Sequence, residues 1–142
     1  EPRDLEEVLE IGRTAYVFDR FHADAALAPG TAARVNETWT RNCCLGTAAD
    51  AVLLALERDR VAAYAACRAG QPGVIILVAA APWARGRGAA RRASLAALAW
   101  LAGRGVRDAE VGTQIRNIPA ARLYESLGFR LIRTSLTFRK LL

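Results

Sequence analysis

Apolar residues at helical spacing fill the first part of the chain. They recur every three to four positions behind Asp4, a candidate N-cap, and predict an amphipathic helix over residues 5–18. A Pro-Gly dipeptide then breaks the chain, so that Thr31 can cap a second helix that is expected to end near Cys44. The first two predicted elements are therefore helices.

Short continuous apolar runs replace this spacing in the middle of the chain. The runs at residues 51–57 and 61–68 are joined by three charged residues and predict an antiparallel hairpin. The β-branched run at residues 74–78 is apolar on both faces, which is typical of a central buried strand. These three runs predict the middle of one sheet.

Helices and strands alternate in the second half of the chain. Alanine and leucine content predicts a helix over residues 89–104, and residues 110–114 are a short predicted strand. A further helix is expected from Asn117 to Leu127, with proline near its first turn and glycine just past its end. Alternating apolar and polar residues over 129–139 predict one or two final strands. The order α-α-β-β-β-α-β-α-β indicates an α/β (α+β) fold on one mixed sheet.

Length and composition are those of a soluble globular protein of one domain. No apolar run approaches the roughly 20 residues that a bilayer span needs. The N-terminus carries acids and a proline where a signal peptide carries a basic patch and an apolar core. A cytoplasmic location is therefore expected, without a membrane partner. Because the three cysteines form no C-x-x-C pair, they are expected to be reduced thiols and not metal ligands.

The charge balance is basic, with 20 basic residues against 14 acids and a net charge of +6. Lys140 is the only lysine, and the planar fork of the arginines suits phosphate oxygens, so an anionic ligand is favoured. The basic residues are spread along the chain and do not cluster with aromatics on one element. This distribution disfavours a nucleic-acid partner.

A glycine-rich basic segment, residues 85–90, lies between the central strand and the helix that follows it. Small residues let backbone amides approach an anion closely, and the helix N-terminus adds unsatisfied N–H groups. The segment lacks the Gly-Lys-Ser/Thr end of a P-loop and the third glycine of a Rossmann fingerprint. On these residues alone it predicts either a pyrophosphate cradle or an ordinary glycine turn with solvated arginines.

Two longer segments resemble the signatures of one enzyme family. The stretch from Val78 to Ala90, with Pro82 and an R-x-x-G-x-A run, resembles motif A of the GCN5-related N-acetyltransferases, the GNAT superfamily. The stretch from Asn117 to Arg130 resembles motif B of the same superfamily, N-x-x-A-x-x-L-Y-x-x-x-G-F. The resemblance covers about residues 50–140.

This resemblance implies a GNAT fold, which is a mixed, mostly antiparallel, twisted sheet with a splayed central strand, flanked by helices. The first strand of that fold is short or missing here, because a helix is predicted almost from the first residue. One domain over residues 1–142 is implied, with acceptor-side helices in 1–46 and an acetyl-CoA-binding core in 50–140. Acetyl-CoA is the implied cosubstrate, with no metal, and a small-molecule amine is the implied acceptor. A homodimer is common in the family and would complete the acceptor site.

The same resemblance assigns a set of residues to acetyl-CoA. The backbone of Val78 and Ala80 is expected to pair with pantetheine amides as an added strand would. Asn117 is expected to reach the pantetheine arm, and Ala120 belongs to the same cofactor-binding set. The residues expected to hold the pyrophosphate are Arg85, Gly86, Arg87, Gly88, Ala89 and Ala90.

Tyr124 is the implied general acid, because the resemblance points its phenol at the thioester sulfur. A phenol of pKa about 10 is a reasonable proton donor to a departing thiolate. The alternative is that Tyr124 is a packing residue on an amphipathic helix. No carboxylate lies between Val74 and Ala81, so the amine is expected to lose its proton through water or to arrive neutral. The nearest unassigned acids of the acceptor region are Asp19, Asp24 and Glu37.

The acceptor region looks like the bacterial nucleotide-sugar branch typified by TDP-fucosamine acetyltransferase. That branch acetylates the 4-amino group of a TDP-linked 4-amino-4,6-dideoxyhexose, whose diphosphate and base suit arginine and aromatic side chains. The implied acceptor-binding residues are Arg20, Phe21, Asp24, Trp39 and Gln114. Two other interpretations stay open. One is a GNAT enzyme for a protein N-terminus or another small-molecule amine, and the other is a non-catalytic acyl-CoA-binding module.

Overall fold

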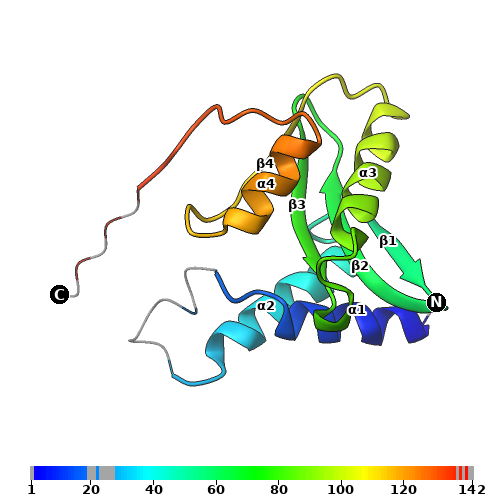
Figure 1. Ribbon diagram of the computed structural model, residues 1–142, viewed down its shortest axis with the longest axis vertical. Coiled ribbons are helices and arrows are strands. Elements are labelled where there is room, and N and C mark those ends of the chain that lie inside the picture. Colours follow the sequence, from blue (N-terminus) through cyan, green and yellow to red (C-terminus); the bar gives the residue numbers. More distant parts are fainter. Residues whose placement is uncertain (1, 19–21, 23–27, 137, 139, 141–142) are drawn as a thin grey trace.

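The computed structural model describes residues 2–18, 22, 28–136, 138 and 140 (Figure 1). Helices and strands alternate along it as the sequence pattern predicts, so the mixed α/β fold is confirmed. In chain order the elements are α1 (Pro2–Thr14), α2 (Thr31–Cys44), β1 (Ala51–Glu57), β2 (Arg60–Arg68), β3 (Gly73–Ala80), the 3-10 turn η1 (Pro82–Ala84), α3 (Ala89–Ala102), β4 (Ala109–Val111) and α4 (Ile118–Ser126).

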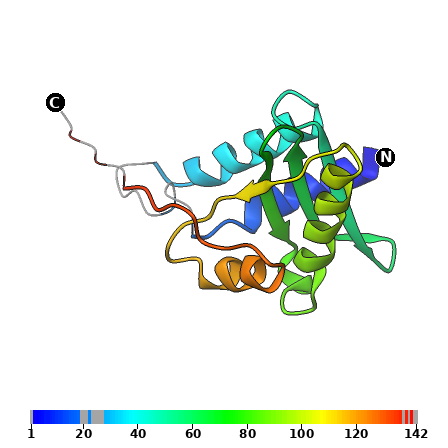
Figure 2. The same cartoon turned by 90° about the horizontal axis from the view of Figure 1, so that it is seen from above.

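The strands form one sheet in the order β1-β2-β3-β4. The first two pairs are antiparallel and the pair β3–β4 is parallel, so the sheet is mixed and mostly antiparallel as expected. Helix α3 packs on β1, β2 and β3 from one side, whereas α1 contacts β2 and β3 from the other side and α2 lies against α1 (Figure 2). The sheet therefore has a helical layer on each face.

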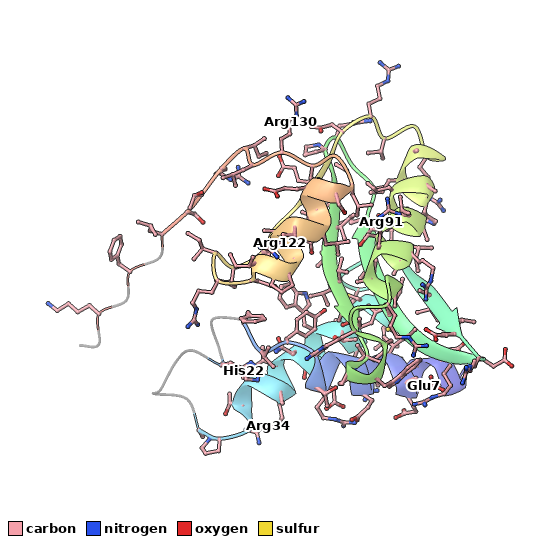
Figure 3. All side chains as sticks on the ribbon, viewed as in Figure 1. Glu7, His22, Arg34, Arg91, Arg122 and Arg130 are labelled. Atoms are coloured by element: carbon pink, nitrogen blue, oxygen red, sulfur yellow. The ribbon has the colours of Figure 1, made fainter. Side chains whose placement is uncertain are left out.

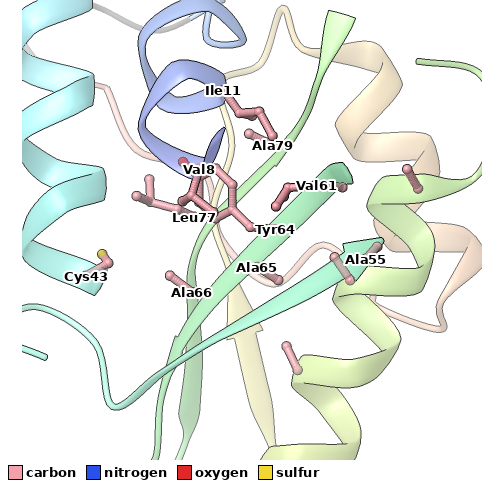
Figure 4. Close-up of a cluster of buried hydrophobic side chains, with 14 of the residues drawn as sticks. Val8, Ile11, Cys43, Ala55, Val61, Tyr64, Ala65, Ala66, Leu77 and Ala79 are labelled. Carbon is pink, nitrogen blue, oxygen red and sulfur yellow. The ribbon is translucent and has the colours of Figure 1, made fainter. Parts of the chain in front are cut away.

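Strand β2 forms the centre of the core. Every residue from Val61 to Cys67 is buried, and four of these seven are alanines. Small side chains let helices approach closely on both faces, and Tyr64 is the one large side chain among them (Figure 4). It lies on the face that α1 covers, near Val8 and Ile11. Within β2, Tyr64 is thus the one phenol among small and aliphatic side chains.

The predicted hairpin between β1 and β2 is confirmed, with its turn at Arg58 and Asp59. Both residues have left-handed backbone angles, φ 52° and 57°, which match the twist of a two-residue hairpin loop. Glu57 pairs directly with Arg60, so β2 begins one residue earlier than the apolar run indicated. The polar residue Arg60 belongs to the ladder because backbone pairing, and not side-chain polarity, decides where a strand ends.

Strand β4 accompanies β3 over three residues only. Gly73, Val74 and Ile75 pair with Ala109, Glu110 and Val111, and no strand of the described chain continues this ladder. On the other edge of β3, Ala66 pairs with Leu77 and Cys67 with Ile75, so Ile76 is an extra residue, a β-bulge. The splayed central strand is confirmed, and its splay begins at this bulge.

Two predicted helix boundaries were wrong at the N-terminal side. Helix α1 spans Pro2–Thr14 and not 5–18, so Asp4 lies inside the first turn and does not cap the helix. Gly30, with a left-handed φ of 78°, holds the cap position of α2, and Thr31 is its first helical residue. The capping prediction failed because glycine reaches the left-handed conformation without steric cost. The predicted end of α2 near Cys44 is confirmed.

The strand predicted over residues 129–139 was wrong for the residues that the structure describes. Residues 129–136 make no ladder, and the side chains of Leu131 and Leu136 are 85% and 81% exposed. The alternating pattern reports a preference for extended backbone, but a strand also needs a neighbouring strand to pair with. Strand β4, predicted over 110–114, ends at Val111 and offers too short an edge.

None of the helices described here is long and apolar enough to cross a bilayer.

Candidate active site

The glycine-rich loop predicted to bind pyrophosphate lies between η1 and α3. Gly86 and Gly88 have φ values of 71° and 75°, a conformation that residues with a Cβ rarely adopt. Gly88 is the N-cap of α3 and supplies no side chain to its first turn, so backbone N–H groups there face outward. A Cβ at Gly86 would meet nothing within 4 Å, so the loop surface is open. An anion fits this cradle.

The arginines of the loop are held by neighbouring elements. Arg87 pairs with Glu57 of β1 at 2.6 Å, and Arg92 of α3 approaches the same carboxylate at 3.8 Å. The Arg85 guanidinium donates to the backbone oxygen of Ala15, just after α1, at 3.2 Å. These contacts fix the loop from two sides, and its backbone amides remain the groups predicted to bind the pyrophosphate. That Arg85 and Arg87 also contact pyrophosphate stays a prediction.

The edge of β3 beyond the bulge matches the expected pantetheine site. Val78 and Ala80 are half-buried and pair with Ala65 and Ala63 of β2, which leaves the opposite edge of β3 without a strand partner. A ligand with amide groups can pair with such an edge as a strand would. The predicted role of Val78 and Ala80 therefore fits the geometry of the sheet.

Helix α4 carries Tyr124 into the site from the far side of the splay. The Asn117 side-chain oxygen accepts the N–H of Ala120 at 3.2 Å and so caps the helix. The ring of Phe129 stands edge-on to that of Tyr124, with 5.9 Å between centroids. Asn117 and Ala120 thus position the helix, and direct contact of either residue with the cofactor stays a prediction.

Tyr124 is half-buried, and burial raises its pKa to about 12. Its phenol therefore keeps its proton at neutral pH. No hydrogen-bond partner for this hydroxyl is found in the described part of the chain. The group is available to donate to a ligand, as a general acid must be.

Two further tyrosines, which the motifs did not reveal, contact each other on the face of the sheet that α1 covers. The hydroxyl of Tyr16 lies 2.9 Å from that of Tyr64, and the hydroxyl of Thr40 of α2 lies 2.9 Å from that of Tyr64. Burial raises the pKa of Tyr16 well above its ordinary value, and Tyr64 and, more weakly, Tyr124 act in the same direction. The chain contains only three tyrosines, and this low number was the one signal in the sequence that could have drawn attention to them.

Two of the five predicted acceptor residues, Trp39 and Gln114, lie among the described residues. Arg20, Phe21 and Asp24 lie outside the described residues. Gln114, predicted to end a strand, lies past β4 in a turn where its backbone oxygen accepts the N–H of Asn117 at 2.9 Å. Trp39 is 42% exposed in a shallow groove that α2 forms by itself. The groove has a volume of about 510 Å³ and is lined by Thr31, Arg34, Val35, Thr38, Trp39 and Asn42.

Among the acids considered as a base, Glu37 is already ion-paired. It lies 3.4 Å from Arg13 of α1 and 3.5 Å from Arg41 of α2. Its carboxylate oxygens are therefore already engaged by two guanidinium groups. Asp19 and Asp24 are outside the described residues.

Residues 7–129 match the family model described as the acetyltransferase (GNAT) family. The match extends over most of the chain, including both motif segments, the bulged strand and the glycine-rich loop. The chain belongs to the acetyltransferase (GNAT) family.

Individual proteins show the same similarity. The spore coat polysaccharide biosynthesis protein SpsD of Bacillus subtilis is 26% identical over 129 residues, which cover 91% of this chain and 45% of SpsD. The crystal structure of PH1933 from Pyrococcus horikoshii superposes with a TM-score of 0.74 at 18% identity, covering 95% of this chain and 86% of that one. PaiA N-acetyltransferase from Thermoplasma acidophilum, solved with coenzyme A, has a TM-score of 0.69 at 14% identity, covering 93% and 87%. The chain therefore spans under half of its curated relative.

Substitution of Gly88 by alanine tests the cradle. A Cβ at a φ of 75° is strained by about 1–2 kcal/mol, so the loop relaxes away from the geometry that faces the anion. We expect the dissociation constant of acetyl-CoA, measured by calorimetry, to rise about tenfold. Gly103→Ala is the matched control, because Gly103 ends the same helix with an ordinary φ of −61°. Equal affinities of Gly88→Ala and wild type would contradict the assignment of the loop.

Proposed function

We propose that the protein transfers the acetyl group of acetyl-CoA to the 4-amino group of a TDP-linked 4-amino-4,6-dideoxy sugar. The observation that carries the acceptor class is the similarity to SpsD, a polysaccharide biosynthesis protein, over most of this chain. Membership of the acetyltransferase (GNAT) family supports the reaction, and the similarity to SpsD supports the acceptor class.

The residues divide the work between binding and proton transfer. The outer edge of β3 at Val78 and Ala80 holds the pantetheine arm, and the amides of the Gly86–Ala90 loop hold the pyrophosphate. Acetyl-CoA supplies the thioester that the amine attacks. Tyr124 holds a proton at its Oη and donates it to the departing sulfur.

The charges of the described acceptor side favour an anionic acceptor. Arg34 stands near the start of α2 and Arg122 on α4, and both side chains are exposed (Figure 3). Glu37 of α2 is neutralised by its two arginine partners. A polycationic amine would meet net positive charge here, whereas a sugar diphosphate would be attracted.

No carboxylate lies on β3, so the proposal includes no protein base. The amine reaches the thioester in its neutral form, and the nitrogen loses one of its two protons to solvent once its bond to carbon forms. The other proton stays in the amide product. The rate then follows the fraction of neutral amine and rises with pH.

The acceptor assignment is tested by mass-spectrometric detection of acetyl transfer. Acetyl-CoA is offered with a TDP-4-amino-4,6-dideoxyhexose, and in parallel with a peptide bearing a free N-terminal alanine, with spermidine and with an aminoglycoside. We expect fast acetylation of the sugar nucleotide and at least 100-fold slower modification of the others. A peptide or polyamine that is acetylated faster than the sugar would remove the proposed acceptor and leave the enzyme class intact.

Substitution of Tyr124 by phenylalanine tests the general acid. We expect kcat to fall on the order of 100-fold or more, with less than about a twofold change in acetyl-CoA affinity, because the proton matters in the transition state. Ser126→Ala is the control, since it removes another hydroxyl from α4, one that bonds only to the Leu123 backbone oxygen.

The pH profile gives the same test a second readout. Because the pKa of Tyr124 is raised to about 12, its phenol stays protonated up to about pH 11. The wild-type rate should therefore rise with pH to the pKa of the amine and show no falling limb below about pH 11. A falling limb near pH 8, or unchanged turnover in Tyr124→Phe, would rule Tyr124 out as the acid.

A further inference from the structure

Three hydroxyl groups between α1, α2 and β2 form a chain whose hydrogen bonds run in one direction. The Thr40 hydroxyl donates its single proton to the backbone oxygen of Asn36 at 2.8 Å. In its 2.9 Å contact with Tyr64, Thr40 can therefore only accept, and the Tyr64 proton points to Thr40. The Tyr64 proton is then in use, so Tyr16 must donate in its own 2.9 Å contact with Tyr64.

This direction determines what Tyr16 can offer to a ligand. Its proton points to Tyr64, so its oxygen has only lone pairs left for a further hydrogen bond. Tyr64 is fully buried, whereas Tyr16 is only partly buried and makes no further hydrogen bond within the described residues. The residue before it, Ala15, accepts from Arg85 of the glycine-rich loop at 3.2 Å, which places Tyr16 next to this loop. Tyr16 is thus an oriented hydrogen-bond acceptor beside the proposed cofactor loop.

The backbone around Tyr16 is held on both sides. The Ala15 N–H donates to Ile11 at 2.8 Å, and the Ala15 oxygen accepts from Arg85 of the cofactor loop at 3.2 Å. One turn earlier, a Cβ at Gly12 would lie 2.8 Å from the Cβ of Thr40, so the Thr40 side chain packs directly on the backbone of α1. This close approach places Thr40 and Tyr16 on Tyr64 together. The loop that binds the cofactor and the hydroxyl chain are therefore one connected structure.

We propose that Tyr16 positions the attacking amine by accepting a hydrogen bond from one of its N–H groups, and that Tyr64 and Thr40 keep Tyr16 in this acceptor state. The inference rests on the proposed role of Tyr124, which marks the reacting end of the site. No proton is transferred to Tyr16. The chain ends at a backbone carbonyl, which does not take up a proton, so the hydroxyls orient the amine and do not act as its base.

A neutral hydrogen-bond acceptor such as Tyr16 suits this site, because β3 carries no carboxylate. A neutral acceptor holds the N–H of a neutral amine and directs the nitrogen lone pair away from Tyr16, toward the carbon that it attacks. An ammonium group would gain less here than beside a carboxylate. The hydroxyl chain therefore favours the form of the amine that can react.

Thr40→Val tests the chain at a residue that does not touch the amine. Valine cannot accept a hydrogen bond, so the Tyr64 hydroxyl donates to Tyr16 in place of Thr40. The Tyr16 hydroxyl then donates toward the amine, although the proposal requires it to accept a hydrogen bond there. We expect kcat/KM for the sugar nucleotide to fall about tenfold, with the KM for acetyl-CoA unchanged. Tyr16→Phe removes the acceptor for the amine together with the hydrogen bond to Tyr64, and the expected fall is about 3- to 10-fold.

Two matched variants separate this role from a structural one. Thr40→Ser keeps the hydroxyl and should restore most of the lost kcat/KM. Thr14→Val removes the same type of bond, a threonine hydroxyl donated to the carbonyl four residues earlier at 2.8 Å, from an exposed place on α1. It should leave kcat/KM unchanged. All rates are taken per folded molecule, from the melting curve of each variant. Equal kcat/KM in Thr40→Val and wild type, or an equal loss in Thr40→Ser, would overturn the proposal.

A spectroscopic measurement tests the hydroxyl chain even if none of the offered amines is acetylated. The chain has three tyrosines, so protein labelled with [13Cζ]tyrosine gives three signals, each assigned by its Tyr→Phe variant. We expect Thr40→Val to shift the Tyr16 signal, which it reaches only through Tyr64, and acetyl-CoA to shift Tyr16 and Tyr124. Thr14→Val should shift neither. A Tyr16 signal that ignores both Thr40→Val and acetyl-CoA would refute the hydroxyl chain, whereas an inactive wild type would refute only the proposed acceptor.

Discussion

Strand β4 leaves β3 after three paired residues, and the rest of the site depends on this divergence. A backbone edge inside a folded protein needs partners for its N–H and C=O groups, and beyond Ile75 no described strand supplies them on one side of β3. The bulge at Ile76 turns the strand at the same level. The glycine-rich loop and the start of α3 follow β3 along the chain. The groups proposed to pair with pantetheine and the groups proposed to bind the pyrophosphate are therefore neighbours in the sequence.

The second constraint is the close packing around β2. Alanines on this strand let α3 approach one face and α1 the other, and Glu7 of α1 accepts the Val61 N–H at 2.6 Å. Tyr64 is the large exception, and burial raises the pKa of its phenol to about 12. A buried phenol needs hydrogen-bond partners, which Thr40 and Tyr16 provide. The close packing that buries Tyr64 therefore also sets the hydrogen bonds of Thr40 and Tyr16.

Local sequence signals predicted the parts of the fold that depend on local chemistry. The hairpin at Arg58-Asp59, the end of helix α2 and the helix that carries Tyr124 follow from turn residues, apolar spacing and flanking proline and glycine. The predicted strand over 129–139 failed because an alternating pattern cannot show whether a neighbouring strand exists. Contacts between distant residues, such as Arg87 with Glu57 and Tyr16 with Tyr64, have no local signal at all.

The most direct test of this account is amide hydrogen exchange along β3, followed with and without saturating acetyl-CoA. The account predicts that exchange in residues 76–80 slows markedly when acetyl-CoA binds, because pantetheine pairs with the open edge. Residues 63–67 of β2, already buried and paired on both sides, should exchange slowly in both states. Unchanged exchange in residues 76–80, with acetyl-CoA binding verified by calorimetry, would show that the splayed edge is not the cofactor site.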